Sequence, residues 1–242
     1  MTSDKTIHQG PFWIDPYDNS IPFPPVELAL RDPDGLLALG GNLSTERLLD
    51  AYQQGIFPWY SDDQPVMWWS PDPRTVLFPE KLHISHSLQK TLNRNTYKVT
   101  LDTAFREVIE ACAEPRKHES GTWITQDMID AYCTLHESGY AHSVESWQDG
   151  KLAGGLYGVA LGRVFFGESM FSRCSDASKV AFTTLVQYLE QQEFKMIDCQ
   201  IHSAHLESLG AEQIPRNTFI DFLKQYCHLP CVSSPWQLTT DC

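Results

Sequence analysis

The sequence predicts a mixed α/β fold in which a small N-terminal module (residues 1–72) precedes a larger domain (residues 73–242). Two observations predict it. The first segment is rich in proline and tryptophan and leaves room for one short helix, whereas amphipathic helices and apolar strands follow from Arg74 onward. In the larger part, three strands come in succession before a helix, a fourth strand and another helix, an order that indicates a mixed sheet.

The N-terminal module is expected to be largely irregular. Repeated prolines in residues 1–40 forbid long helices, and Gly40-Gly41 marks a turn. Residues 42–44 offer N-caps for a helix that Gly55 ends. The stretch IFPWYSDDQPVMWWSPDPR then holds three tryptophans and four prolines. Loops this aromatic usually pack against a neighbouring domain or line a pocket.

The larger domain carries clear start and turn signals. Ser85, Asp102 and Thr125 are candidate N-caps for three helices, and Asp149-Gly150 predicts a tight hairpin turn. Asp176 is expected to open a further amphipathic helix, after which residues 195–201 form a strand parallel to the one before the helix. The predicted strands cover residues 74–78, 140–147, 151–161, 164–172 and 195–201.

Composition limits the class of protein. No apolar run approaches the roughly 18 residues of a membrane helix, and the N-terminus has no signal-peptide core, so we expect a cytoplasmic protein without a membrane partner. The sequence does not indicate an oligomeric state, and a monomer is the default expectation. The seven cysteines are odd in number and form no CxxC pair, which argues against a disulfide framework or a zinc ribbon. No phosphate-binding loop or GxGxxG is present, and neither a metal nor a cofactor is expected.

A basic segment interrupts an acidic chain. The net charge is −13, yet residues 73–98 hold five lysines and arginines against one acid. Such a segment is either a solvated helix surface or a local phosphate-binding face, and charge alone does not separate the two.

The stretch VFFGESMFS places one carboxylate, Glu168, inside an apolar strand. Burying a charge there is costly unless it is paired or faces a cavity. It is therefore either half of an internal salt bridge or a pocket acid that meets a cationic group. Asp198 and Gln200 alternate with apolar residues in MIDCQI and are expected to share one face of a strand, as a hydrogen-bonded edge pair or as site residues.

Several blocks in order carry a family resemblance: AYQQGIFPWY, WWSPDPR, LHISHSL, GGLYG, FFGESMFS, IDCQ and HLESLGA. Together they resemble the leucyl/phenylalanyl-tRNA–protein transferase family. The resemblance implies a larger domain similar to the acetyltransferase (GNAT) fold. It also implies transfer of Leu or Phe, with Met as an additional candidate, from aminoacyl-tRNA to proteins that begin with Arg or Lys. The product would be a degradation signal of the N-degron pathway.

Two other functions stay open at this point. One is an N-acetyltransferase of the GNAT type, although the segment RCSDAS lacks the glycine usual in a pyrophosphate loop. The other is a non-catalytic module that binds N-terminal peptides or RNA.

The resemblance also implies roles for particular residues. Gln200, oriented by Asp198, would draw off the proton of the acceptor amine, and Glu168 and Asp198 would supply negative charge for the acceptor's cation. The remaining substrate-binding positions are Leu156, Phe165, Met170 and Leu185 for the transferred side chain, with Tyr52, Trp59, Trp123 and Tyr132 for the terminal adenosine and aminoacyl group. The tRNA-binding positions are Arg74, Lys81, His86, Lys90 and Arg94.

One structural requirement follows. By ideal alternation Phe165 and Met170 point to opposite faces of their strand. A pocket that uses both needs a bulge or twist near Gly167.

Overall fold

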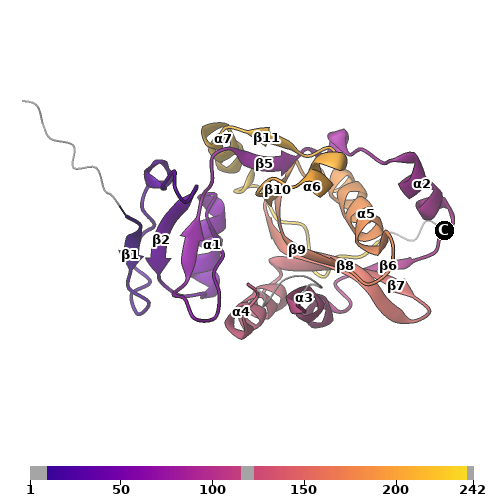
Figure 1. Ribbon diagram of the computed structural model, residues 1–242, viewed down its shortest axis with the longest axis horizontal. Coiled ribbons are helices and arrows are strands. Elements are labelled where there is room, and N and C mark those ends of the chain that lie inside the picture. The colour runs from indigo at the N-terminus through magenta and orange to yellow at the C-terminus, as the bar shows by residue number, and fades with distance from the viewer. Residues whose placement is uncertain (1–9, 116–122, 239–242) are drawn as a thin grey trace, which may run out of the picture.

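The computed structural model describes residues 10–115 and 123–238, which form two sheets and the helices around them (Figure 1). The first sheet lies within the N-terminal module and has the strand order β1-β2-β4-β3. The second has seven strands in the order β11-β5-β10-β9-β8-β7-β6. The change from one sheet to the other falls between Trp69 and Arg74.

The N-terminal module is more regular than expected. It holds four short strands, β1 Phe12–Ile14, β2 Leu36–Gly40, β3 Phe57–Pro58 and β4 Met67–Trp69, and a 3-10 turn at Val26–Leu28. These strands were not predicted because each has only two to five residues, which is too short for an alternating pattern to be recognised among the prolines. The helix α1 Thr45–Gln53 was predicted, and the Ser44 side chain caps it by accepting the Arg47 N–H.

The larger domain follows the predicted element order. Strands β7 Ala141–Gln148, β8 Lys151–Leu161 and β9 Val164–Ser172 are followed by α5 Ala177–Gln191, β10 Met196–Gln200 and α6 Ala204–Ser208. The β9–β10 pair is parallel and its neighbours pair antiparallel, which gives the predicted mixed sheet. Asp149 and Gly150 both have positive φ, as the predicted hairpin turn requires.

The remaining elements of the domain extend the sheet and cover it. They are β5 Arg74–Leu77, the 3-10 turn Pro79–Lys81, α2 His86–Asn93, β6 Lys98–Leu101, α3 Phe105–Ala113, α4 Gln126–Glu137, β11 Glu212–Ile214 and α7 Arg216–Tyr226. The edge strands β6 and β11 were not predicted, because both are short and neither is strongly apolar.

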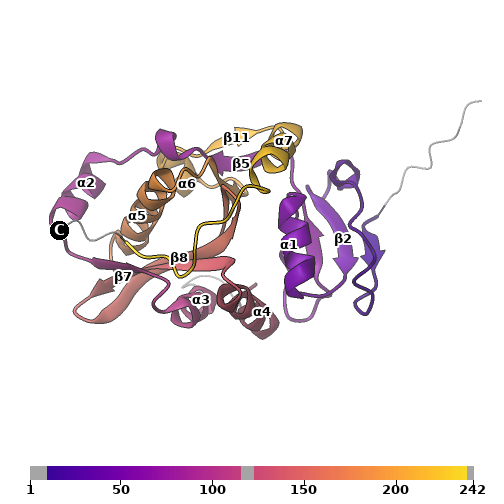
Figure 2. The same ribbon diagram turned by 180° about the vertical axis from the view of Figure 1, so that it is seen from behind.

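Helices cover the two faces of the large sheet. Helices α3 and α4 lie on one face and α5 on the other, as Figures 1 and 2 show from opposite sides. Each face has its own apolar cluster. The cluster under α3 and α4 continues through Tyr52 into the N-terminal module as far as Trp68 and Ile14. The module and the domain therefore share one core.

One predicted cap is wrong. Asp102 does not cap α3, whose N-cap is Ala104. Asp102 instead has φ 54° and accepts the backbone N–H groups of Ser143 and Trp236, while its carboxylate lies 2.8 Å from His142 Nδ1. The Asp102 carboxylate therefore bonds to residues that are distant in the sequence, and it is not available to cap α3.

Candidate active site

The candidate site lies where β9 and β10 diverge. The two strands pair at only three positions, Met196 with Val164, Ile197 with Phe165 and Asp198 with Phe166. Beyond these positions a cavity of about 650 Å³ opens between the continuing segments, residues 167–172 of β9 and residues 199–203 after the start of β10. A cavity of this size is ample for an amino-acid side chain and part of a nucleotide.

One wall of the cavity is apolar. Leu156, Phe165, Met170 and Leu185 all line it, as the sequence led us to expect, and they pack in the same cluster on the α5 face of the sheet. Phe182 joins them from α5. This wall offers no charge to a ligand, so it suits an apolar side chain.

A bulge explains how Phe165 and Met170 come to share this wall. Tyr157 of β8 pairs with Ser169, but the next residue, Gly158, pairs with Gly167, so Glu168 is the extra residue of β9. The bulge predicted near Gly167 is therefore present. A Cβ on Gly158 would lie 2.2 Å from the Phe166 carbonyl oxygen and 2.5 Å from the Phe165 ring, which only glycine avoids.

The bulge aims Glu168 into the cavity and gives it three hydrogen-bond donors. Its Oε1 accepts from the Tyr52 hydroxyl at 2.8 Å and from Gln200 Nε2 at 2.9 Å, and its Oε2 accepts from the Tyr132 hydroxyl at 3.0 Å. Among the described residues no basic side chain forms an ion pair with it. Burial and the nearby Asp198 charge raise the pKa of Glu168 to about 8, although its hydrogen bonds oppose the shift.

Tyr52 and Tyr132 do not lie where a ligand would touch them. Both side chains are fully buried, both are absent from the cavity wall, and their hydroxyls hydrogen-bond to Glu168 and to each other. The expectation that they hold the adenosine and aminoacyl group is therefore corrected. They lie on the side of Glu168 away from the cavity, on α1 and α4, and donate to the carboxyl that lines it.

Gln200 and Asp198 do not share one exposed face. The register of β10 against β5 shifts between them, and Gln200 has φ 62°, so the alternation assumed from the sequence is broken. Gln200 lines the cavity, whereas Asp198 is completely buried and outside it. Asp198 Oδ1 accepts the backbone N–H of Gln200 at 2.9 Å.

Arg74 occupies both oxygens of Asp198. Its Nε and Nη2 donate to Oδ1 and Oδ2 at 2.8 and 2.7 Å, and the guanidinium lies over the rings of Phe57 and Phe219. The side chain is buried, so the expected contact between Arg74 and a tRNA phosphate is corrected. For the same reason Asp198 is compensated inside the protein and does not present its charge to an acceptor. The sequence placed Arg74 at the start of a basic segment but could not show its partner 124 residues later.

Two tryptophans form the outer part of the site. Trp59 and Trp123 both line the cavity, and Trp59 is 40% exposed, as an aromatic platform for a base requires. Ser178 and Phe182 also line the cavity but were not predicted; they lie with Leu185 at helical spacing on one face of α5, and that periodicity could have found them. His202 and His205 line the cavity too and were not predicted; burial lowers the pKa of His205.

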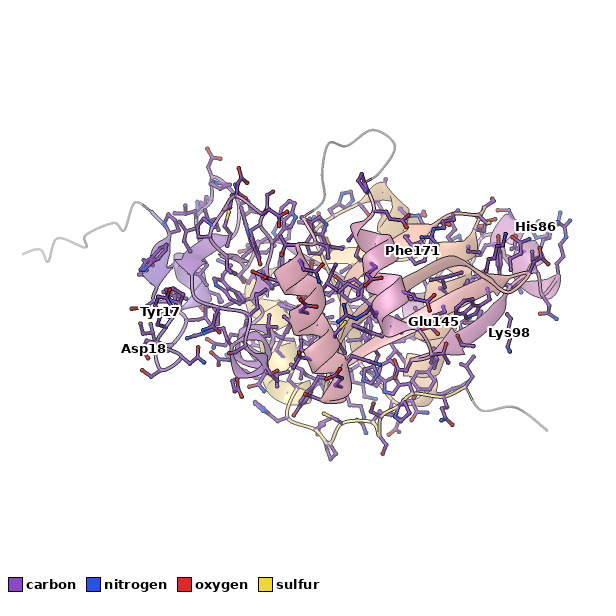
Figure 3. The ribbon with its side chains drawn as sticks, turned by 90° about the horizontal axis from the view of Figure 1, so that it is seen from below. Tyr17, Asp18, His86, Lys98, Glu145 and Phe171 are labelled. Atoms are coloured by element: carbon purple, nitrogen blue, oxygen red, sulfur yellow. The ribbon has the colours of Figure 1, made fainter. Side chains whose placement is uncertain are left out.

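The other expected tRNA-binding residues are on the surface. Lys81, His86, Lys90 and Arg94 are all exposed, the last three on or next to α2. In Figure 3, His86 lies near the end of the molecule opposite Tyr17 and Asp18 of the N-terminal module, with Phe171 of the cavity wall between them. Lys81 is engaged in an ion pair with Glu212 at 2.6 Å.

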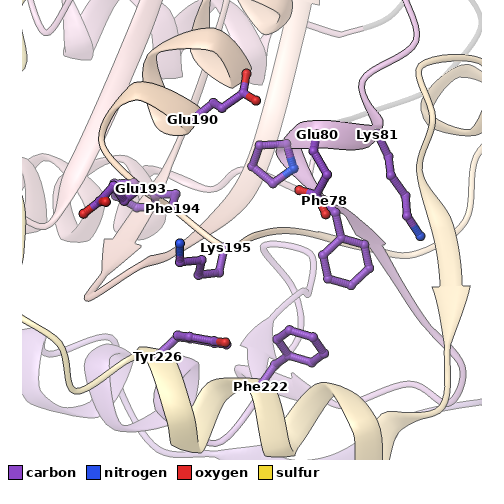
Figure 4. A pocket seen from close by; sticks show the side chains of 10 residues that line it. Phe78, Glu80, Lys81, Glu190, Glu193, Phe194, Lys195, Phe222 and Tyr226 are labelled. Carbon is purple, nitrogen blue, oxygen red and sulfur yellow. The ribbon is translucent and has the colours of Figure 1, made fainter.

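A second cavity, of about 570 Å³, lies away from this site (Figure 4). Phe78, Phe194, Phe222 and Tyr226 line it together with charged residues of both signs. Lys81 is the one predicted site residue in its wall.

Neither a metal centre nor a membrane span is found in the described part of the chain. No group of three or more histidine, cysteine or acidic side chains there is placed to hold a metal ion. No helix among the described residues has the length and apolar character needed to cross a bilayer.

Comparisons with known proteins cover both the N-terminal module and the larger domain. The sequence profile of the leucyl/phenylalanyl-tRNA protein transferase family matches residues 76–224, and the profile of its N-terminal domain matches residues 41–72. A leucyl/phenylalanyl-tRNA–protein transferase of Pseudomonas fluorescens (strain Pf0-1) is 58% identical over 212 residues, which cover 88% of this chain and 94% of that protein. One from Nitrosospira multiformis is 61% identical over 203 residues, covering 84% and 88%.

One solved structure shows a distant likeness. An aminoglycoside acetyltransferase matches with a TM-score of 0.35 and 13% identity over 60% of this chain and 98% of that one, too remote to carry an argument. The two profiles and the two relatives establish the family, since their matches span both the N-terminal module and the domain that holds the cavity. The chain belongs to the leucyl/phenylalanyl-tRNA–protein transferase family.

Proposed function

We propose that this protein transfers Leu or Phe from aminoacyl-tRNA to the N-terminal amine of acceptor proteins that begin with Arg or Lys. One observation carries the proposal: a single cavity joins an apolar wall of Leu156, Phe165, Met170 and Leu185 to a polar floor of Glu168 and Gln200. The apolar wall receives the transferred side chain, and the polar floor receives the acceptor amine. Because a cavity without polar contacts separates apolar side chains by only about 1–3 kcal/mol, use of both Leu and Phe, and some use of Met, is expected.

The reaction demands positioning more than activation. The ester that joins the amino acid to its tRNA is already reactive, so holding the amine close to the ester carbonyl supplies most of the acceleration. Gln200 is placed for this role. Its Nε2 is committed to Glu168, which leaves its amide oxygen to accept a hydrogen bond from the amine. Asp198 contributes through the backbone of Gln200, by holding the N–H of a residue with positive φ.

The donor end of the tRNA is assigned to the outer part of the site. Trp59 and Trp123 supply aromatic surface for the terminal adenosine, since every base has a face that stacks on such rings. Lys90 and Arg94 supply charge for phosphates, His86 adds a polar group on the same helix, and Lys81 could contribute only in exchange for its ion pair with Glu212. Phosphate contacts carry no sequence information, so discrimination among tRNAs through this surface should be weak.

The start of α5 argues against an acetyltransferase. A helix N-terminus attracts anions, and a thioester cofactor would place its pyrophosphate there. Here Asp176 occupies the N-cap position with φ 63° and puts a carboxylate at that end. Asp176 Oδ1 is paired with Lys179 Nζ at 3.1 Å, so this end of the helix already holds an anionic group and the cation that compensates it.

One assay tests the proposal. The protein is incubated with labelled Leu-tRNA or Phe-tRNA and an Arg-N-terminal casein fragment, and label in the peptide is measured. The control acceptor is the same fragment with its N-terminal amine acetylated, which should receive none. Acetyl transfer from acetyl-CoA without aminoacyl transfer would overturn the proposal. A Gln200→Ala variant with normal turnover and unchanged aminoacyl-tRNA binding would exclude the role given to Gln200.

A further inference from the structure

The carboxyl of Glu168 closes a ring of hydrogen-bonding groups with two tyrosines. The Tyr52 hydroxyl contacts Oε1, the Tyr132 hydroxyl contacts Oε2, and the two hydroxyls contact each other. The ring thus has three oxygen–oxygen contacts, drawn from helix α1, helix α4 and the bulge in β9.

Three contacts of this kind need three protons. Each of the two tyrosine hydroxyls carries one proton. If Glu168 is ionised, one of the three contacts therefore has no proton, and two oxygen lone pairs face each other there. A neutral Glu168 supplies the missing proton. Each tyrosine hydroxyl then donates once and accepts once, and the carboxyl group donates through one oxygen and accepts through the other. The hydrogen bonds of this ring are therefore complete only when Glu168 is protonated.

The surroundings of Glu168 favour the neutral acid as well. Tyr52 faces it from α1, Tyr132 from α4, Tyr157 from β8 and Gln200 from β10, and none of these groups is a cation. Asp198 is the nearby charge of the same sign, and its own partner is Arg74. These groups and burial leave Glu168 with a pKa of about 8. A free α-amino group titrates at about 7.7–8.0, so the two groups would compete evenly for one proton.

We propose that Glu168 takes the proton that the acceptor ammonium must lose before its nitrogen can attack, with Tyr52 and Tyr132 acting as positioning residues. This inference rests on the proposed transfer reaction. Glu168 first releases its own proton to solvent, and the ammonium then pairs with the ionised carboxylate and passes one N–H proton to it. The neutral amine then forms the new C–N bond, a second N–H proton passes to the ribose oxygen as the ester C–O bond breaks, and the third proton stays on the amide. Glu168 afterwards returns its proton to solvent.

The first test needs no substrate. Infrared difference spectra between the wild-type protein and Glu168→Gln isolate the carboxyl group of this residue. We expect the signal of a protonated carboxylic acid near neutral pH and its loss around pH 8. Loss of that signal below about pH 5, as for an ordinary glutamate, would overturn the inference whether or not the protein transfers amino acids.

The second test separates proton transfer from simple binding. Single-turnover rates with saturating Phe-tRNA and acceptor are compared for wild type and Glu168→Gln, whose amide keeps the shape but cannot take a proton. We expect a deficit of about 15–30-fold at pH 6.5, because a free amine of pKa about 7.7–8.0 is mostly protonated there and the variant must wait for its neutral form. The deficit should shrink to about 2-fold or less near pH 9, where the free amine is already neutral. An equal deficit at both pH values would show that Glu168 only binds the acceptor.

The tyrosines have a matched control. Tyr132→Phe removes one donor to the carboxylate and should move the pH–rate profile of transfer to higher pH, because hydrogen bonds to the ionised form lower its pKa. Tyr188→Phe removes a hydroxyl from α5 that is not part of the site and should leave the profile in place. An unmoved profile for Tyr132→Phe would contradict the role of the ring. A wild-type protein with no transfer at all, but with the infrared signal present, would contradict the proposed function and leave the protonated ring standing.

Discussion

Arg74 and Asp198 form a bidentate ion pair inside the protein. The two N–O distances are 2.8 and 2.7 Å, and the side chains are 1% and 0% exposed. Arg74 also donates to the Gly55 carbonyl at the end of α1. The pair therefore fastens the N-terminal module to β10, the strand that ends in Gln200.

Removing one partner of this pair should destabilise the protein strongly. Arg74→Ala leaves Asp198 buried without compensation, and we expect the free energy of unfolding in urea to fall by about 3–5 kcal/mol. Arg106→Ala is the control, because Arg106 pairs with Asp130 on the surface and such pairs contribute at most about 1 kcal/mol. Equal losses in the two variants would contradict this account of the buried pair.

The bulge that presents Glu168 should depend on Gly158. A methyl group there would meet the Phe166 carbonyl and the Phe165 ring, so Gly158→Ala should lower the free energy of unfolding by about 1–3 kcal/mol and displace Phe165 from the cavity wall. Gly10→Ala is a suitable control, since its new Cβ would meet nothing within 4 Å. A crystal structure of Gly158→Ala with an unmoved Phe165 ring would be inconsistent with this prediction.

The limits of sequence reasoning are visible at the same strands. Periodicity predicted the strands 164–172 and 195–201, and the demand that Phe165 and Met170 share a wall predicted the bulge. The prediction that Asp198 and Gln200 share one strand face was wrong, because the register of β10 against β5 shifts between them. Such a shift depends on how two strands pair and cannot be recognised in the sequence of one strand. The burial of Arg74, Tyr52 and Tyr132 was equally invisible, since each depends on a partner more than 30 residues away.

The apolar wall should set the choice between donors. Leu185→Phe narrows the cavity, so kcat/KM for Phe transfer should fall by about 10–200-fold relative to that for Leu transfer, because the larger side chain loses more room. Leu189→Phe enlarges a buried residue of the same helix that does not line the cavity, and its Phe-to-Leu ratio should match the wild type. An equal change of the Phe-to-Leu ratio of kcat/KM in Leu185→Phe and Leu189→Phe would contradict the prediction.

The exposed charges of α2 should govern the salt dependence of tRNA binding. Neutralising Lys90 or Arg94 with alanine should weaken binding of different aminoacyl-tRNAs about equally and reduce the slope of log K against log salt by about 1 per charge. Lys224→Ala on α7, whose partner is Asp221, serves as the control and should keep the slope. Filter binding between low and moderate salt checks the prediction, and an unchanged slope for both α2 variants would remove this helix from the interface.

The raised pKa of Glu168 should make stability fall with pH in a defined window. The folded protein holds this proton up to about pH 8, whereas the unfolded chain releases it near 4.5, so between these values the folded state binds more protons. Stability from this group is then complete below about pH 4.5 and is lost as pH rises through about 8. Glu168→Gln cannot titrate, so its stability relative to wild type should increase steadily across the window, as measured by urea denaturation at successive pH values. Tyr188→Phe should show a constant offset instead, because Tyr188 has a pKa of about 12 and does not titrate there. A constant offset for Glu168→Gln as well would mean that Glu168 is ionised in the folded protein throughout the window.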